Sequence, residues 1–299
     1  MSKIDFTGRV AIVTGGGGGL GRSYAIELAK RGAKVVVNDL GGLKNGGGSS
    51  LSAADRVVEE IERQGGEAVP NYDDVATLEG GEKIVRTAID AFGKVDILIN
   101  NAGILVDSSF AKIDEKKWDA AIAVHLKGAF CVTKFAYLQM MRQNYGRIVM
   151  TTSASGLAGN FGQTNYASAK MGVVGFANAL KLEGARYNIK VNVIAPVAGT
   201  RLTEDVVPPE IFKRMSVDFV APAVLYMCSE QCQDSGMVIN AGLGYFSRSA
   251  IVTGEGVILR GGNKIPTPEN VMENWGRITS LENPRFCYQL SEMSALWRK

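Results

Sequence analysis

A dense run of glycine follows a short apolar segment near the start of the chain. "RVAIVT" at 9–14 has the composition of a β-strand, Gly15 to Gly19 follow without interruption, and Gly21 comes after one leucine. A strand, a glycine turn and a helix form an arrangement in which helix N-terminal amides face a phosphate. Side chains would block close approach of the phosphate, and the tight turn needs a residue that tolerates positive φ. The run therefore favours a nucleotide-binding turn at one edge of a sheet.

Short apolar runs alternate with longer helical patterns along most of the chain. The expected strands are 9–14, 33–39, 67–72, 95–101, 146–153, 190–196 and 236–242, and the expected helices are 20–31, 52–64, 78–92, 116–144 and 165–187. Apolar runs without polar alternation are typical of parallel strands that helices cover on both faces. The pattern predicts an α/β fold with a doubly wound parallel sheet and with ligands at the carboxyl ends of its strands.

The alternation stops near residue 244. Within the remaining chain, "TPENVMENW" indicates a helix start, where Thr267 caps, Pro268 fits the first turn and Glu269 suits the helix dipole. We expect one domain over residues 1–245, followed by an extension over 246–299 that packs on the core or on a dimer partner.

Composition narrows the classes of partner. Of the 299 residues 46% are apolar, and the formal net charge of +3 is too small to indicate nucleic acid or a membrane surface. The four cysteines form no CxxC pair and the chain has one histidine, so we expect no metal site. "MSKIDFTGR" lacks the apolar stretch of a secretory signal, and "LWRK" is not an SKL-type peroxisomal address. We expect a soluble intracellular protein with a small-molecule substrate.

The second expected strand ends at Asp39, close to the distance at which a dinucleotide-binding fold places an acidic residue. Such a carboxylate accepts hydrogen bonds from the adenosine ribose and repels a 2′-phosphate, and no Lys or Arg lies between Thr14 and Gly21. The pattern favours NAD over NADP. The alternative is an ordinary carboxylate in a turn. The glycines alone fit two registers, Gly16/Gly18/Gly21 and Gly15/Gly19/Gly21.

A serine, a tyrosine and a lysine occupy a second region, "SASGLAGNFGQTNYASAK", from Ser153 to Lys170. Tyr166 and Lys170 are one helical turn apart, although such a pair is also common on surface helices. A phenol with a pKa of about 10 is a poor base near neutrality, and a nearby ammonium favours the phenolate. Tyr166 is therefore a candidate general base for alcohol oxidation, Lys170 its partner, and Ser153 a group that positions the substrate oxygen.

Together these motifs resemble the short-chain dehydrogenase/reductase family over roughly residues 7–245. The match comprises "TGGGGGLG", "NNAG" at 100–103, a serine thirteen residues before the tyrosine, and "YASAK". The resemblance selects the register Gly15/Gly19/Gly21, with Leu20 inside it, and makes Gly16 to Gly18 a variable middle. It implies further cofactor contacts, namely Asp74 and Val75 beside adenine, Asn101 near a ribose, and Tyr166 and Lys170 at the nicotinamide ribose.

"NDLGG", "VHLKGAF", "NYGRIVMT" and "APVAGTRLTE" carry a closer resemblance to the (3R)-hydroxyacyl-CoA dehydrogenase region of the peroxisomal multifunctional enzymes of type 2. It implies a homodimer and a peroxisomal location, with the cytoplasm as the alternative. Two positions depart from the general family pattern. His125 stands where most members have a catalytic asparagine, and a satisfied core histidine is the simpler interpretation. Thr200 is displaced by one place from the expected threonine that contacts nicotinamide.

Three functions remain open at this point. The first is NAD-dependent oxidation of (3R)-hydroxyacyl-CoA to 3-ketoacyl-CoA. The second applies the same chemistry to a steroid alcohol or a secondary-metabolite ketone. The third is an NAD-binding regulator without turnover, which the intact Ser/Tyr/Lys set argues against because a regulator needs only the glycines and Asp39.

Overall fold

A computed structural model describes residues 3–42, 52–199, 208–259 and 265–296 of the chain. It divides into two compact units, residues 1–248 and residues 249–299. The first unit contains all the candidate site residues.

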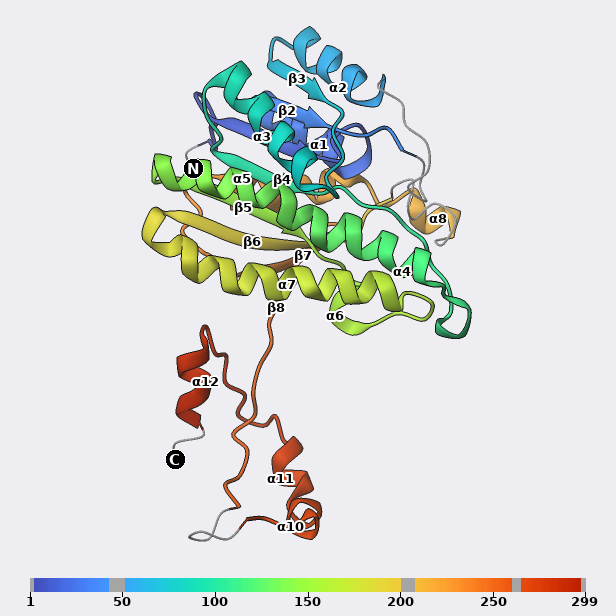
Figure 1. Cartoon of the computed structure of the whole chain (residues 1–299), viewed down its shortest axis with the longest axis vertical. Helices are drawn as coiled ribbons and strands as arrows, with labels where there is room; N and C mark the ends of the chain where they lie inside the picture. Colours follow the sequence, from blue (N-terminus) through green and yellow to red (C-terminus); the bar gives the residue numbers. More distant parts are fainter. Residues whose placement is uncertain (1–2, 43–51, 200–207, 260–264, 297–299) are drawn as a thin grey trace. The chain divides into compact units, whose positions relative to one another are not determined.

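An eight-stranded sheet forms the centre of the first unit (Figure 1). Its strands are β1 (Val10–Thr14), β2 (Lys34–Asn38), β3 (Glu67–Asn71), β4 (Ile97–Asn100), β5 (Gly146–Thr151), β6 (Ile189–Pro196), β7 (Val238–Gly242) and β8 (Tyr245–Ser249). Their order is β3-β2-β1-β4-β5-β6-β7-β8, and the first seven pair in parallel. The predicted strands and the doubly wound fold are confirmed. The chain reverses its direction of travel across the sheet between β1 and β4, where such folds bind ligands.

The eighth strand was not predicted. β7 and β8 are joined by Leu243 and Gly244 alone, with φ values of 55° and 81°. Two successive left-handed residues are typical of a hairpin turn, and so short a connection permits only antiparallel pairing. Residues 245–249 are mostly exposed on an edge strand, so their sequence lacks the buried apolar run that indicates the inner strands.

Helices cover both faces of the sheet. The longer ones are α1 (Gly19–Ala29), α2 (Ser52–Arg63), α3 (Leu78–Phe92), α4 (Glu115–Ala121), α5 (Gly128–Gln143), α7 (Thr164–Gly184) and α9 (Ala221–Cys228). The shorter ones are η1 (Phe110–Lys112), η2 (Ile122–Lys127), α6 (Ala154–Ala158), η3 (Ala185–Tyr187), α8 (Pro209–Phe212) and η4 (Val217–Phe219). One core cluster includes residues of α1, α2 and α9. The other includes residues of α3, α5 and α7, which cross the near face of the sheet in Figure 1.

The predicted helix over 116–144 is interrupted. It consists of α4, the π-helical segment η2 and α5. By length and composition alone, Glu115–Gln143 could cross a membrane. Its side chains Val132, Ala136 and Met140 are buried in the core on the same face of the sheet as α3 and α7. We therefore interpret Glu115–Gln143 as a core helix of the fold.

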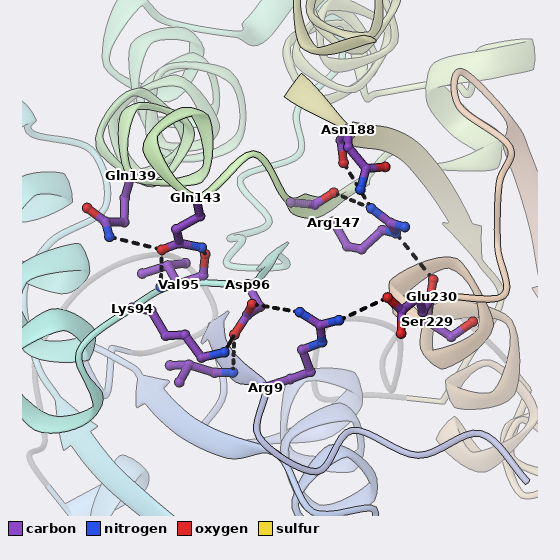
Figure 2. Close-up of polar contacts among 12 residues, drawn as sticks. Arg9, Lys94, Val95, Asp96, Gln139, Gln143, Arg147, Asn188, Ser229 and Glu230 are labelled. Atoms are coloured by element: carbon purple, nitrogen blue, oxygen red, sulfur yellow. Dashed lines mark hydrogen bonds and ion pairs between the residues drawn. The ribbon is translucent and has the colours of Figure 1, made fainter. Parts of the chain in front are cut away.

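Charged groups are tightly paired at the amino ends of the strands (Figure 2). The Asp96 carboxylate, just before β4, accepts a hydrogen bond from Val10 N at 2.9 Å. It also pairs with Arg9 at 3.1 Å and with Lys94 at 3.0 Å. Because its side chain is only 3% exposed, these partners replace the water that a free carboxylate would bind.

Arg147 lies in the same cluster and is 1% exposed. Its guanidinium donates to the carbonyls of Gly146, Asn188 and Ser229 at 2.9, 3.0 and 3.2 Å. Ser229 is the C-cap of α9 and Asn188 that of η3, so the cation lies at the negative ends of two helices. This edge of the sheet joins β1, β4, β5 and β6 through polar contacts.

The second unit contains α10 (Pro268–Glu273), α11 (Trp275–Thr279) and α12 (Leu290–Leu296). Thr267 caps α10 as predicted, and its side chain and that of Asn270 exchange hydrogen bonds with each other's backbone. Thr253 and Arg285 form an isolated antiparallel bridge. That this extension packs on the core or on a partner stays a prediction.

Candidate active site

The carboxyl ends of β1 and β4 are joined by a polar network. Thr14 Oγ1 accepts hydrogen bonds from the backbone N–H groups of Asn101 and Ala102 at 3.0 and 3.1 Å. The Asn101 amide donates to the Thr14 and Gly15 carbonyls at 3.0 and 3.1 Å. Asn101 therefore fixes the start of the glycine turn, whereas contact with a ribose stays a prediction. Thr14 was missed, although its place at the end of a buried strand could have indicated it.

The glycine register follows from the backbone. Gly15 and Gly19 have φ values of 62° and 51°, in the left-handed region that disfavours other residues. A Cβ on Gly21 would lie 2.1 Å from the Gly15 carbonyl oxygen. These are the three positions of the register that the family resemblance selects.

Two of the three glycines in the middle of the run, Gly16 and Gly17, leave little room for a side chain, although the family resemblance makes this stretch variable. A Cβ on Gly16 would lie 2.9 Å from Val37 Cγ1, and one on Gly17 would lie 2.8 Å from Asp39 Oδ2. The Asp39 carboxylate accepts hydrogen bonds from Gly17 N at 2.9 Å and from Gly41 N at 2.7 Å. Only Gly18 has open space around the added carbon. Asp39 is thus held against the turn, where each oxygen retains a second lone pair for a ligand.

The N-terminus of α1 fits a phosphate group. Gly18 caps the helix without a side-chain hydrogen bond, and the first turn carries no acidic residue. The amides of Gly19, Leu20 and Gly21 therefore begin a helix of 11 residues whose first turn carries no acidic side chain. Among the described residues, a Cβ on Gly18 would meet nothing within 4 Å, so this helix end fits the pyrophosphate of a dinucleotide.

Ser153, Tyr166 and Lys170 come together beyond β5. Ser153 is the N-cap of α6, and its Oγ accepts a hydrogen bond from Ser155 N at 3.2 Å. The Ser153 side chain lies near enough to Tyr166 to lower the pKa of its phenol. The Lys170 ammonium lies 5.6 Å from the centre of the Tyr166 ring and donates to the Thr151 carbonyl at 2.8 Å. The three predicted side chains therefore lie in one site, and their catalytic roles stay predictions.

The net effect of the protein's own groups is to raise the pKa of Tyr166. Burial raises this pKa most strongly, the Ser153 hydrogen bond lowers it, and the charge of Asp107 raises it. Burial also lowers the pKa of Lys170 to about 7. The expected preference for phenolate therefore needs additional positive charge at the site, which an oxidised nicotinamide ring carries when it is bound.

The two residues predicted to contact adenine differ in their exposure to solvent. Asp74 is exposed, and its carboxylate accepts from Ala76 N at 2.9 Å. Val75 is 8% exposed and lines the same pocket as Thr14 and Lys170. Neither contact with adenine is tested by this arrangement. Thr200 falls outside the described residues.

His125 lies in the π-helical segment η2, and its ring contacts the ring of Tyr166. It is 4% exposed, and its ring meets that of Tyr166 edge to face at 5.0 Å. A turn of π-helix is rare and is often found at functional sites. Among the described residues, no group of three or more His, Cys, Asp or Glu side chains is placed to hold a metal ion.

This fold and this constellation define a dinucleotide-binding oxidoreductase. The family model described as "short chain dehydrogenase" matches residues 9–209, so the chain belongs to that family and is an enzyme of the short-chain dehydrogenase/reductase type. Members of this family use NAD or NADP on small-molecule substrates.

Peroxisomal multifunctional enzyme A of Dictyostelium discoideum is 52% identical over 289 residues, which are 97% of this chain and 64% of that protein. A putative short-chain type dehydrogenase/reductase of Mycobacterium tuberculosis is 48% identical over 277 residues, covering 93% of this chain and 96% of that one. The solved structure of full-length peroxisomal multifunctional enzyme type 2 from Drosophila melanogaster superposes with a TM-score of 0.83 and 41% identity, over 99% of this chain and 49% of that one. The chain thus spans less than two thirds of these multifunctional relatives.

Proposed function

We propose that the chain oxidises (3R)-hydroxyacyl-CoA to 3-ketoacyl-CoA with NAD, and that Tyr166 is the general base. The single observation that carries the oxidoreductase chemistry is the Lys170 ammonium 5.6 Å from the centre of the Tyr166 ring, where Ser153 acts on the same phenol. The substrate class is supported by the likeness to peroxisomal multifunctional enzymes over 97% of the chain.

Each residue has a separate task in this proposal. Ser153 holds the substrate oxygen, because its hydroxyl both donates and accepts. Tyr166 Oη takes the proton from the carbinol oxygen. Lys170, fixed by the Thr151 carbonyl, holds its amino group beside the phenol, and this group is positively charged below its pKa of about 7. The amides of Gly19 to Gly21 would hold the pyrophosphate of the dinucleotide, whose oxidised nicotinamide would supply the hydride acceptor and a positive charge.

NAD rather than NADP is supported by Asp39, whose carboxylate is fixed at the glycine turn. A 2′-phosphate placed there would meet a like charge. Asp39→Ala should raise the ratio of NADP⁺ to NAD⁺ efficiency about tenfold, a change of about 1.4 kcal/mol. An unchanged ratio would refute the charge argument.

The deciding experiment supplies NAD⁺ with each enantiomer of a 3-hydroxyacyl-CoA and follows NADH absorbance. We expect turnover of the R enantiomer and none of the S enantiomer. Turnover of a steroid alcohol without any of the acyl-CoA would instead establish the second hypothesis. NAD binding by calorimetry without turnover of any substrate in the panel would favour the regulator.

Assembly and location belong to the same proposal. The resemblance to the multifunctional enzymes supports a homodimer and a peroxisomal location. Sedimentation at several protein concentrations tests the first, and fluorescence microscopy of the tagged full-length protein tests the second. A monomer at every concentration or a diffuse cytoplasmic signal would overturn the corresponding part.

A further inference from the structure

Two buried asparagines end neighbouring strands of the sheet. Asn38 is the last residue of β2 and Asn71 the last residue of β3, and the two lie opposite each other in the parallel register. They are 1% and 5% exposed. A buried amide without hydrogen-bond partners costs free energy on folding, so such amides are almost always paired. The partners of these two side chains therefore indicate what the pair holds in place.

The two side chains are hydrogen-bonded to each other and to the residue that follows β3 by two positions. Asn38 Nδ2 donates to Asn71 Oδ1 at 2.8 Å and to the Asp73 carbonyl at 2.9 Å. Asn71 Oδ1 also accepts from Asp73 N at 3.0 Å, and Asn71 Nδ2 donates to Asp73 Oδ2 at 2.8 Å and to Thr87 Oγ1 at 2.9 Å. Asp73 is thus held at its N–H, its carbonyl and its carboxylate.

The backbones of the same asparagines hold the other two parts of the predicted cofactor site. The Asn38 carbonyl accepts a hydrogen bond from Gly16 N at 2.9 Å. The Asn71 carbonyl accepts one from Asp39 N at 3.0 Å. The pair therefore connects the glycine turn, Asp39 and the 73–75 segment. These are the parts of the chain predicted to contact the pyrophosphate, the ribose and the adenine of a dinucleotide.

The 73–75 segment is packed closely on its other side. A Cβ on Gly80, in the first turn of α3, would lie 1.9 Å from the Asp74 carbonyl oxygen. Contacts this close leave no room for a side chain between the helix and the segment. Helix α3 therefore supports the segment on one side, and the asparagine pair fixes it to the sheet on the other.

We propose that Asn38 and Asn71 are positioning residues for the adenosine half of the dinucleotide, because they fix the spacing between Asp39 and the 73–75 segment. Both side chains act through the residues that they hold. A buried network with satisfied hydrogen bonds specifies one arrangement, since any other would leave amide groups unpaired. The inference rests on the dinucleotide binding of the proposed function and is independent of the alcohol or ketone that the enzyme converts.

ADP-ribose is the probe for this inference, because it carries the adenosine and the pyrophosphate without nicotinamide and its binding needs no turnover. Asn38→Leu keeps a side chain of similar size and removes both donated hydrogen bonds. We expect calorimetry of the variant to show ADP-ribose binding about tenfold weaker than in wild type. Hydrogen exchange should be faster at the backbone amides of the 73–75 segment. An affinity within about twofold of wild type would overturn the proposal.

Asn192 supplies the matched control. It lies in β6 and is 1% exposed, its Nδ2 donates to the Asp234 carbonyl at 2.9 Å, and its Oδ1 accepts from Met237 N at 3.0 Å. Asn192→Leu makes the same change at an equally buried amide that joins β6 to the residues before β7. It should lower the free energy of unfolding in urea as Asn38→Leu does, and leave ADP-ribose affinity within about twofold of wild type. Equal losses of affinity in both variants would overturn the positioning role.

Kinetics provides a second readout. Ser153, Tyr166 and Lys170 lie beyond β5 and on α7, so Asn38→Leu should raise the KM for NAD⁺ about tenfold and leave kcat within about twofold. A lower kcat with an unchanged KM would contradict the assignment to the adenosine half. If Asn38→Leu does not fold, Asn38→Ser keeps one donor and should weaken ADP-ribose binding about threefold.

The outcomes separate this inference from the proposed function. Wild-type protein that binds ADP-ribose but converts no hydroxyacyl-CoA would overturn the proposed substrate alone, and the variants would still test the asparagine pair. Wild-type affinity in Asn38→Leu and Asn38→Ser, with normal turnover, would overturn the inference alone. Wild-type protein that binds no ADP-ribose would overturn the cofactor assignment and this inference together.

Discussion

The two ends of the sheet handle buried charge in opposite ways. At the amino ends, Asp96 has three partners and Arg147 donates to three carbonyls (Figure 2). At the carboxyl ends, within the described part of the chain, the Lys170 ammonium donates to one carbonyl, and His125 and Thr151 each keep a buried polar atom without a hydrogen-bond partner. Satisfied charges stabilise the fold, whereas unsatisfied groups are available to ligands. The difference indicates that one edge is built for stability and the other for chemistry.

The largest expected effect is at the carboxyl edge. Tyr166→Phe removes the proton acceptor but keeps the ring against His125, so kcat should fall by about 10²- to 10⁴-fold. Steady-state kinetics measures this, and calorimetry should show NAD affinity close to that of wild type. Activity near the wild-type value would refute the base assignment.

At the amino edge the expected loss is one of stability. Asp96→Ala leaves Val10 N and the Arg9 cation without their buried acceptor, so the free energy of unfolding should fall by about 2–4 kcal/mol. Urea titration followed by circular dichroism measures it. The folded variant should keep its kcat, and a large loss of kcat would contradict the separation of the two edges.

The buried Lys170 predicts a pH-dependent change in stability. Its pKa is about 7 in the folded protein and about 10.4 in an unfolded chain. Between these values the unfolded state binds more protons, so this group makes stability rise with pH by up to about 1.4 kcal/mol per pH unit. Lys170→Met removes the contribution.

The comparison of variant and wild type at several pH values isolates that group. Relative to wild type, Lys170→Met should be most stable at pH 7 and below, and should lose this advantage as the pH rises toward about 10. Thermal unfolding at each pH measures the difference. A difference that is constant with pH would mean that Lys170 titrates normally in the folded protein.

The smallest effect concerns two neighbouring glycines. A Cβ on Gly17 would displace the Asp39 carboxylate, whereas one on Gly18 meets nothing within 4 Å. Gly17→Ala should weaken NAD binding about tenfold, and Gly18→Ala should change it about twofold or less, differences of about 1.4 and 0.4 kcal/mol. Calorimetric titration with NAD⁺ distinguishes them, and equal losses would contradict the role of Asp39.

Much of the fold could be predicted because its signals are local. Five of the seven parallel strands, β1, β2, β4, β5 and β6, carry a buried run, and the family motif selects the Gly15, Gly19 and Gly21 positions. The strand β8 could not be predicted, since an exposed edge strand has no such run. The π-helical turn at His125 was missed as well, because sequence periodicity does not distinguish it from the α-helices on either side.

The sequence by itself determined the doubly wound sheet, the glycine turn with Asp39, and the pairing of Tyr166 with Lys170 across one helical turn. Only the tertiary structure decided which groups are buried and which are satisfied. It placed Asp39 on the amide of Gly17, lowered the pKa of Lys170 to about 7, and left His125 Nδ1 without a hydrogen-bond partner among the residues that the structure describes. The physical reason is that local patterns specify backbone conformation, whereas desolvation and hydrogen-bond satisfaction depend on residues far apart in the chain.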